Sequence, residues 1–322
     1  MKLCKVLLGW MLAMMTAVSP VMAAAAENAY VDAVQMAAEE LTNEAEVMTG
    51  MQAAVPDLLQ PSAPGEKVED NGKARIDYSN TRDGYVMVQY LAETKKRLKV
   101  QIKGPRTTYT YNITPGEWAV LPLTDGNGNY QIKIYQNVSG NQYSSVLAMK
   151  QEVELADEFA PFLRPNQYVN YSEASMAVEK ARELTVTTEH PLEKVGVIYD
   201  YVVKTLTYDR EKARTVKSGY LPVLDTVMEE KKGICFDYAA LMTGMLRSLG
   251  IPCKMIFGYA GNAYHAWISV WSEDTGWVDG VIFFDGVAWH RLDPTFASYD
   301  NQSDAIMKYI GNGKNYKEKY FY

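Results

Sequence analysis

The chain has few of the residues that usually build metal sites, since its 322 residues include three cysteines and three histidines. No two cysteines form a CxxC pair and no two histidines have an HxxxH spacing, so a recognisable zinc-binding pattern is missing. No basic stripe stands out, and the formal net charge is −7. That balance argues against nucleic acid and against anionic membrane surfaces as partners.

Long apolar runs are also missing, and the run nearest the N-terminus has the features of a secretory signal. Residues 1–26 contain Lys2 and Lys5, an apolar stretch from Val6 to Val18, and a small-residue cleavage site near Ala23. A transmembrane anchor is the alternative, but this stretch is shorter than the roughly 20 residues that a spanning helix needs. We therefore predict a secreted or cell-surface-associated protein with no stable membrane insertion after the signal peptide is cleaved.

Signal cleavage would remove Cys4 and leave Cys235 and Cys253 in a compartment where disulfides can form. If residues 235–249 form one helix, the Cα atoms of the two cysteines lie on the order of 20 Å apart at ~1.5 Å rise per residue. A disulfide allows only about 7 Å between Cα atoms. We expect both thiols to be free, and an exported protein that keeps a free thiol usually has a use for it.

The chain after the signal divides into three parts by composition. Residues 27–73 are a lead-in whose first half is either weakly helical or loosely ordered, and whose second half is a Pro- and Gly-rich linker. Residues 74–156 alternate short β-type runs with turn signals, which predicts a small immunoglobulin-like β-sandwich. This part contains no cysteine or histidine, so both simple packing and ligand binding stay open as its role. Its strands are expected at 84–90, 97–103, 107–113 and 130–135.

Residues 157–322 are predicted to form a second domain in which a helical block packs on an antiparallel sheet, so the overall class is α+β. The apolar stripe of the segment 191–206 indicates a helix that faces the core. Helices are expected over 172–184, 191–206, 220–230 and 235–249. Strands are expected over 254–259 and 264–271, followed by a hairpin of 277–284 and 287–293.

The sequence Gly233-Ile234-Cys235 places a cysteine at the start of an apolar, helix-forming run. Helix N-termini have free backbone N–H groups and the positive end of the helix dipole, so they stabilise a thiolate. The run ends at Gly250, which is followed by Pro252, a helix-terminating pattern. Cys235 should therefore lie at the exposed end of a rigid, buried helix, where a nucleophile can be held in place.

Strand alternation selects one histidine as the partner of this cysteine. In the strand 264–271, His265 shares a face with Trp267 and Ser269, and this strand can lie beside the strand that ends in Asp293. His290 alternates away from Asp293. A relay of Cys235, His265 and Asp293 fits acyl transfer, although a structural histidine and a metal site are competing interpretations of these residue types.

Three sequence blocks resemble the transglutaminase-like superfamily, which has a papain-like fold. They are Lys232 to Ala239 with the trailing Leu246 to Pro252, then His265-Ala266-Trp267, then Leu292 to Thr295. The resemblance implies that Cys235 is the nucleophile, His265 the general acid and base, and Asp293 the carboxylate that orients the imidazole. It also implies a thioester intermediate whose oxyanion is held by the backbone N–H of Cys235 and a second donor. The acidic cluster of the calcium-regulated animal enzymes is missing, so no metal and no cofactor are expected.

The resemblance leaves the reaction open among crosslinking, deamidation and hydrolysis of protein or peptide amides, because all three proceed through an acyl-enzyme. The expected partner is a protein or peptide substrate, including proteins of the cell envelope. The alternative of a different class is a non-catalytic cell-surface binding or adhesion module. Peptide turnover that depends on Cys235 would distinguish the enzyme from the binding module.

Overall fold

The computed structural model describes residues 56–260, 262–273, 276–278, 281–284, 289–292 and 316–322. They belong to one compact unit, Ala53–Tyr322. The predicted signal peptide, 1–26, and the possible helices of 27–55 lie outside the described residues. Among the described helices, none has the length and apolar character needed to cross a membrane.

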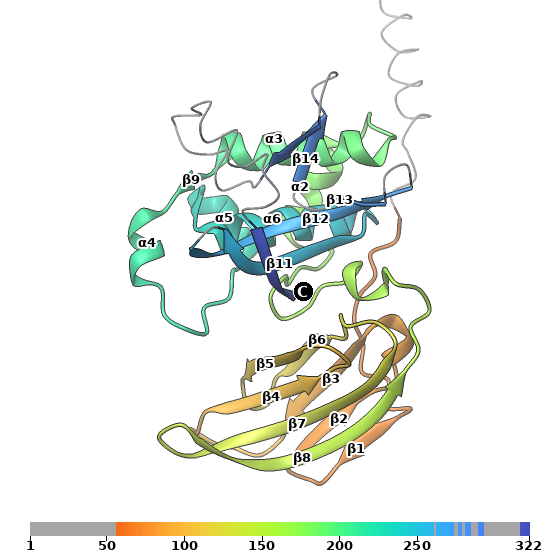
Figure 1. The fold of residues 1–322 in the computed structure, drawn as a ribbon, viewed down its shortest axis with the longest axis vertical. Coiled ribbons are helices and arrows are strands. Elements are labelled where there is room, and N and C mark those ends of the chain that lie inside the picture. The colour runs from red at the N-terminus through yellow and green to blue at the C-terminus, as the bar shows by residue number, and fades with distance from the viewer. Residues whose placement is uncertain (1–55, 261, 274–275, 279–280, 285–288, 293–315) are drawn as a thin grey trace, which may run out of the picture. The chain divides into compact units, whose positions relative to one another are not determined.

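The N-terminal part of the unit consists of antiparallel strands in two four-stranded sheets (Figure 1). The first sheet has the order β1-β2-β3-β6 and the second the order β5-β4-β7-β8. Their bounds are β1 Val68–Asp70, β2 Ala74–Asp77, β3 Tyr85–Tyr90, β4 Leu98–Lys103, β5 Thr108–Ile113, β6 Trp118–Pro122, β7 Gly128–Ser139 and β8 Gln142–Val153. The four predicted strands are confirmed as β3, β4, β5 and β7, whereas the turn signals did not predict β1, β2, β6 or β8.

Period-two alternation explains how these sheets bury one face. In β4, Leu98, Val100 and Ile102 are buried, while Lys99 and Gln101 between them are only partly buried. In β5, Tyr109, Tyr111 and Ile113 are buried and the residues between them are exposed. The buried residues of both sheets belong to one hydrophobic cluster, so the two sheets share a core.

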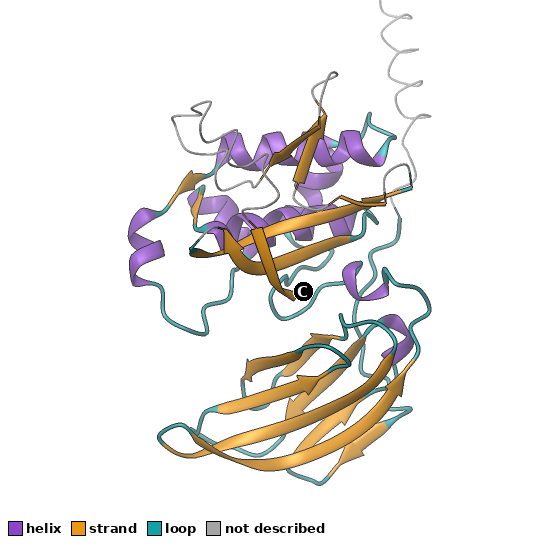
Figure 2. Ribbon diagram, viewed as in Figure 1, coloured by secondary structure: helices purple, strands orange, loops and turns teal. Residues whose placement is uncertain are grey.

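The C-terminal part contains the helices, which group beside a sheet (Figure 2). The helix α6, Cys235–Ser248, packs against α2, α3 and α5 and against two strands of the sheet. The other helices are α2 Met176–Leu184, α3 Pro191–Thr205, α4 Arg210–Thr215 and α5 Leu224–Glu230, with short 3₁₀ turns η1 Thr81–Asp83 and η2 Ala160–Phe162. The predicted core stripe of α3 is confirmed, because Val195, Ile198, Tyr199 and Val202 are buried.

Two helices begin later than the sequence pattern predicts. The helix expected from residue 172 begins at Met176, because Ser172 N–H donates to the Ser175 hydroxyl and closes a turn. The helix expected from residue 220 begins at Leu224, after Pro222. Proline disfavours the helical conformation of the residue before it, so the helix cannot include Leu221.

The sheet beside α6 is antiparallel with the order β13-β12-β11-β16. Its strands are β11 Cys253–Ala260, β12 Ala263–Ser272, β13 Gly276–Val278 and β16 Tyr316–Phe321. The pattern did not predict β16, which pairs with β11. The predicted hairpin is confirmed in part, since β14, Val281–Phe284, pairs with β15, Trp289–Leu292, and its turn lies outside the described residues. The start of the predicted strand 277–284 belongs instead to β13, which pairs with β12.

These elements confirm the α+β class, with the helix of Cys235 packed on an antiparallel sheet and further antiparallel sheets preceding it. The end of α6 is also as predicted, because Gly250 has a φ of +75° that favours glycine. The domain boundaries at 74–156 and 157–322 stay a prediction.

Candidate active site

Cys235 is the first residue of α6 and is half-buried, while every later residue of the helix, 236–248, is buried. The N-cap residue is Ile234, in an extended conformation, and it makes no side-chain cap hydrogen bond. A serine or aspartate at this position would occupy N–H groups of the first turn, whereas isoleucine has no oxygen with which to do so. The first turn of α6 can therefore offer N–H groups to an anion that forms beside the sulfur.

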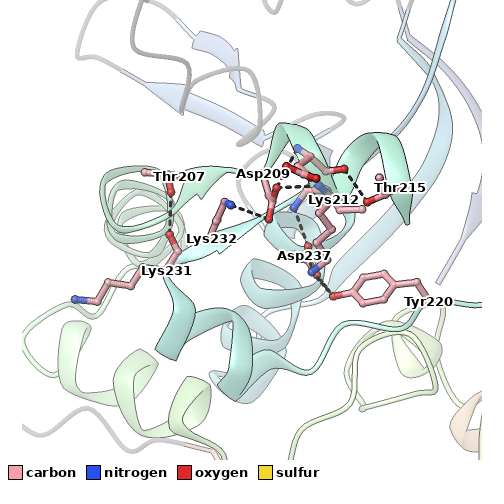
Figure 3. A network of polar contacts seen from close by, with 10 residues as sticks. Thr207, Asp209, Lys212, Thr215, Tyr220, Lys231, Lys232 and Asp237 are labelled. Atoms are coloured by element: carbon pink, nitrogen blue, oxygen red, sulfur yellow. Dashed lines mark hydrogen bonds and ion pairs between the residues drawn. The ribbon is translucent and has the colours of Figure 1, made fainter. Parts of the chain in front are cut away.

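A buried carboxylate fixes this helix end from within (Figure 3). Asp237 has no exposed surface, and its Oδ2 accepts a hydrogen bond from Ile234 N–H at 2.7 Å and pairs with Lys212 Nζ at 2.9 Å. Its Oδ1 accepts a hydrogen bond from the Tyr220 hydroxyl. Lys212 Nζ also donates to that hydroxyl at 2.7 Å. The lysine balances the carboxylate charge two residues from Cys235.

Gly233 explains how the carboxylate fits. A Cβ at Gly233 would lie 2.6 Å from Asp237 Cβ, closer than real Cβ atoms approach. Glycine is therefore needed at this position because the backbone passes close to Asp237, and not because the backbone adopts a conformation that only glycine favours.

A second carboxylate, Asp209, brings Lys212 to this place. Asp209 is the N-cap of α4 and accepts hydrogen bonds from the N–H groups of Glu211 at 3.1 Å and Lys212 at 2.9 Å. It also pairs with Lys232 Nζ at 3.1 Å, and these contacts, the Lys212 N–H first, lower the pKa of the Asp209 carboxyl. The short strands β9, Thr207–Tyr208, and β10, Lys232–Gly233, pair in parallel beside it.

Burial and hydrogen bonds shift the pKa values of Tyr220 and Lys212. Burial raises the pKa of Tyr220 to about 12, and its bond to Asp237 adds to the rise. Burial lowers the pKa of Lys212, but its contacts with Tyr220 and Asp237 outweigh that effect and the pKa is raised. At neutral pH Tyr220 is therefore a neutral donor and Lys212 a cation.

The predicted strand of His265 is confirmed as β12, and the shared face of His265, Trp267 and Ser269 follows from its pairing. His265 lies opposite Gly258 in β11, and its ring stacks on Trp267 with centroids 6.4 Å apart. A Cβ at Gly258 would lie 2.6 Å from the Trp267 ring, so glycine allows this packing. Unlike a half-buried strand, β12 is buried on both faces.

Aromatic contacts bring the start of α6 to the end of β12 that holds His265. The Phe236 ring lies 4.9 Å from Phe257, which stacks on Tyr264 at 5.9 Å. Burial raises the pKa of Tyr264 to about 12, and the charge of Cys235 is one of the smaller contributions. Cys235 and the residue next to His265 therefore lie within electrostatic reach.

Asp293, the third predicted member, lies outside the described residues. The strand before it, β15, pairs with β14, whereas the hydrogen-bonded neighbours of β12 in the described sheet are β11 and β13. The sequence alternation leads us to expect the strand before Asp293, β15, beside the strand of His265. In the structure β14 lies beside β12, and β15 is hydrogen-bonded to β14. The alternation could not reveal this pairing.

Cys235 and Cys253 are both free, which confirms the prediction that they are not bridged to each other. Cys253 is fully buried, its sulfur lies 3.6 Å from the Thr243 hydroxyl, and burial raises its pKa to about 11. Cys253 is therefore a core residue, and Cys235 is the thiol that solvent can reach. Within the described part of the chain, no group of three or more His, Cys, Asp or Glu could hold a metal ion.

The sequence pattern missed three polar residues and an aromatic residue at this site. Asp237 could have been found, because it stands three residues after the N-cap, where a helix-capping carboxylate is expected. Lys212 and Tyr220 come from residues 17 to 25 positions before Asp237 and give no local signal. Tyr264 stands in the strand alternation at a position typical of a packing residue, so the sequence gives no sign that it belongs to the site.

Residues 178–280 match the family model of the transglutaminase-like superfamily. The match contains Cys235 and His265 and ends before Asp293. The predicted resemblance of this part of the chain is therefore confirmed.

Two relatives align with parts of the chain. Uncharacterized protein YebA of Bacillus subtilis strain 168 is 27% identical over 117 residues, which cover 30% of this chain and 16% of YebA. Protein-glutamine gamma-glutamyltransferase of Pseudomonas aeruginosa is 29% identical over 68 residues, which cover 17% of this chain and 10% of that protein. The aligned segments thus span less than a fifth of either relative.

Solved structures resemble the chain distantly. The periplasmic domain of TgpA from Pseudomonas aeruginosa is 14% identical and superposes with a TM-score of 0.34. The alignment covers 68% of this chain and 94% of that domain. Red sea bream transglutaminase is 13% identical and superposes with a TM-score of 0.32. The alignment covers 70% of this chain and 53% of the transglutaminase chain. At these scores the two structures say nothing about activity.

Proposed function

We propose that this chain is a secreted cysteine acyltransferase or cysteine protease that acts on protein or peptide amides through a thioester on Cys235. One observation carries the proposal. The half-buried sulfur of Cys235 begins an otherwise buried helix, and it lies inside the segment that matches the transglutaminase-like family. A thiol at that position can meet a substrate, whereas the buried Cys253 cannot.

In the proposed reaction, the Cys235 thiolate attacks the amide carbon and a carbon–sulfur bond forms. The carbon–nitrogen bond breaks, and the leaving nitrogen takes a proton from the His265 imidazolium, departing as ammonia or as an amine. An amine or a water molecule then attacks the thioester, gives its proton to His265, and releases the thiolate. Asp293 orients the imidazole.

The helix N-terminus is proposed to stabilise the oxyanion of both tetrahedral intermediates. The N–H of Cys235 is the first donor, since the N-cap Ile234 has no side-chain oxygen to compete for the first turn. Asp237 supports this arrangement from the buried side by holding Ile234 N–H. Lys212 offsets the carboxylate charge, which would otherwise oppose a thiolate nearby.

Secretion is proposed from the N-terminal pattern, and the proposed substrates are therefore extracellular or cell-envelope proteins or peptides. The experiment expresses the full chain in a bacterial host and sequences the N-terminus of the exported protein. Cleavage between Ala23 and Ala26 is expected. A chain that keeps residues 1–26 in the cytoplasm would contradict the localisation.

Turnover tests the activity directly. Peptides with a glutamine amide are mixed with peptides that carry a lysine amine, and the ammonia and product masses separate crosslinking from deamidation and hydrolysis. We expect Cys235→Ala to lower turnover about 10⁴-fold or more. The matched control is Cys253→Ala, which changes a buried thiol at the start of β11 and should keep turnover.

His265→Ala should also abolish turnover, and the pH profile of the wild type should report the ionisation of its nucleophile and its acid. Turnover that survives Cys235→Ala would defeat the mechanism. If neither the wild type nor any variant turns over amides, the non-catalytic surface module is supported instead.

A further inference from the structure

A cleft of about 360 Å³ opens beside the N-terminus of α6, in the size range of cavities that enclose a small ligand. Phe236, the residue after Cys235, lines it, and so does Tyr264, the residue before His265. We name it the aromatic cleft. Any chain that occupies it passes the two residues that flank the proposed nucleophile and acid.

One wall of the aromatic cleft is the outer face of β4 and β5. Lys99 pairs with Asn112, and Gln101 pairs with Thr110, so these side chains share a face. Lys99, Thr110 and Asn112 line the cleft. Their neighbours along each strand are buried in the sandwich core, which leaves a polar wall of hydroxyl, amide and ammonium groups.

The opposite wall is aromatic. The Tyr220 ring meets Phe236 edge-on at 6.1 Å, with an interplanar angle of 90°. The Tyr220 hydroxyl is held by Asp237 and Lys212, so its polar end is bound. Lys212 Nζ also lies 4.3 Å from the centroid of the Tyr220 ring, and Tyr220 lines the cleft. Tyr264 continues this wall and is about half exposed. Rings of this kind accept apolar and aromatic side chains.

Contacts among the lining residues join the two walls. Gln167 Nε2 donates to the Asn112 carbonyl at 2.6 Å, and a Cβ at Gly219 would lie 3.2 Å from Asn112 Nδ2. Tyr168 packs on Tyr111 at 5.8 Å and stacks on Tyr322 at 4.2 Å. The cleft is therefore formed before a ligand arrives, which lowers the entropy cost of binding.

The charge of the residues that line the cleft indicates which of the two substrates of an acyltransferase, the acyl donor or the amine, it binds. Lys99 is the one charged side chain among the described residues that line the cleft, and no carboxylate is among them. An amine donor brings an ammonium that Lys99 repels and that no lining carboxylate would hold. A peptide around an uncharged amide can instead use the rings for its side chains and the hydroxyl and amide groups for its backbone.

We infer that the aromatic cleft binds the acyl-donor peptide on the side of its reacting amide, with a preference for apolar or acidic flanking residues over basic ones. The inference rests on the proposed function, because it names the substrate of that reaction. The polar wall from β4 and β5 gives these strands a role in substrate selection.

The experiment uses three fluorescent peptides with the same glutamine and the same aromatic neighbour, flanked by glutamate, alanine or lysine. Turnover is measured with the full chain, and binding is measured by anisotropy with Cys235→Ala. We expect the glutamate peptide to exceed the lysine peptide by about threefold to fivefold, the size of an exposed charge interaction. Lys99→Glu should reverse that order.

The matched control is Lys150→Glu, which makes the same charge change on the far edge strand of the same sheet. It should leave the order of the peptides unchanged. Thermal unfolding checks that Lys99→Glu is folded, and if it is not, Lys99→Met should remove the preference without reversing it.

The outcomes separate the two claims. Turnover with an order that Lys99→Glu leaves unchanged overturns the cleft assignment and leaves the proposed function standing. If no peptide is turned over, but the order of the peptide affinities measured by anisotropy reverses in Lys99→Glu, the result supports the cleft as a peptide-binding site and contradicts the proposed function. Binding of none of the peptides to Cys235→Ala overturns the cleft assignment.

Discussion

The strands β4 and β12 both belong to antiparallel sheets, but they differ in whether their polar side chains are exposed or buried. In β4, Lys99 and Gln101 face away from a core formed by the apolar residues between them. In β12, both faces are buried, and His265 and Ser269 are buried together with apolar neighbours. The helix beside β12 goes further, because it buries the charged residues Asp237 and Arg247.

The difference indicates where each region derives its stability. The sheets of β1 to β8 are stabilised mainly by apolar burial, although Asp77 in β2 is buried. The polar residues on their outer faces are accessible to water, so most substitutions at those outer positions cost little. The region around α6 buries polar groups that depend on specific partners, and removing one partner leaves the other unsatisfied. The proposed chemistry lies in the second region, where positions are held by such bonds.

The largest expected difference concerns Arg247. Its guanidinium donates two hydrogen bonds to the backbone oxygen of Cys253, at 2.7 and 2.9 Å, and one each to the backbone oxygens of Arg164 at 2.8 Å and Tyr322 at 2.6 Å. Arg247→Met leaves these buried oxygens without that donor, and we expect a loss of about 4 kcal/mol in the free energy of unfolding. Urea denaturation followed by tyrosine and tryptophan fluorescence measures it.

The control for Arg247 is Arg97→Met in the sandwich, an exposed arginine beside the Tyr143 ring. This variant should lose less than about 1 kcal/mol. Equal losses in the two variants would remove the distinction between the regions.

The next effect concerns the ion pair at the helix N-terminus. Lys212→Met leaves the buried Asp237 carboxylate without its cation, and we expect a loss of about 3 kcal/mol. Adding Asp237→Asn should restore part of that loss, because the uncompensated charge is then gone. In the sandwich, Arg75 pairs with Asp70 at 2.6 Å in an exposed position.

Breaking that exposed pair with Arg75→Met should cost less than about 1 kcal/mol. Urea denaturation of all three variants gives the comparison. A double variant no more stable than Lys212→Met would show that charge balance is not what Lys212 provides.

Alternation should produce a smaller contrast between the strands. In β4, Val100→Ala should cost about 2 kcal/mol and Gln101→Ala less than about 0.5 kcal/mol. In β12, Ile268→Ala should cost about 3 kcal/mol and its neighbour Ser269→Ala about 1 kcal/mol, because both are buried. A Ser269→Ala variant as stable as wild type would mean that only one face of β12 matters.

The smallest expected signal is alkylation of Cys253 in the native protein. Its pKa of about 11 means that about one thiol in a thousand is ionised at pH 8, and the thiolate is the reactive form. Its labelling should therefore rise as the pH approaches 11 and remain far below that of half-buried Cys235 at neutral pH. Peptide mapping after iodoacetamide treatment measures both rates, and equal labelling at pH 8 would contradict the assignment of the two thiols.

Much of the fold could be predicted where one segment carries its own pattern. The apolar stripe of α3, the cysteine at the start of α6 and the alternation of β4 were sufficient to place these elements. β8 could not be placed, because only two of its residues are buried and its sequence shows no clear alternation. β16 becomes recognisable only through its pairing with β11, which lies nearly 60 residues earlier in the chain.

The candidate site shows the same limit. Cys235 was found from the glycine and the apolar run that surround it, and His265 from the period of its strand. Lys212 and Tyr220 could not be found, because the pairing of β9 with β10 and the turn of α4 bring them to Asp237. Long-range backbone pairing thus decides which polar residues meet, and a single sequence does not reveal it.

The most direct test is the mass of the intermediate. The full chain is mixed with an excess of a glutamine-containing peptide, quenched in acid during turnover, and analysed by peptide mapping. A thioester on the peptide that contains Cys235, with a mass equal to the donor peptide minus ammonia, is the expected result. Turnover without an adduct at Cys235, or an adduct at Cys253 alone, would contradict the role of Cys235 as the nucleophile.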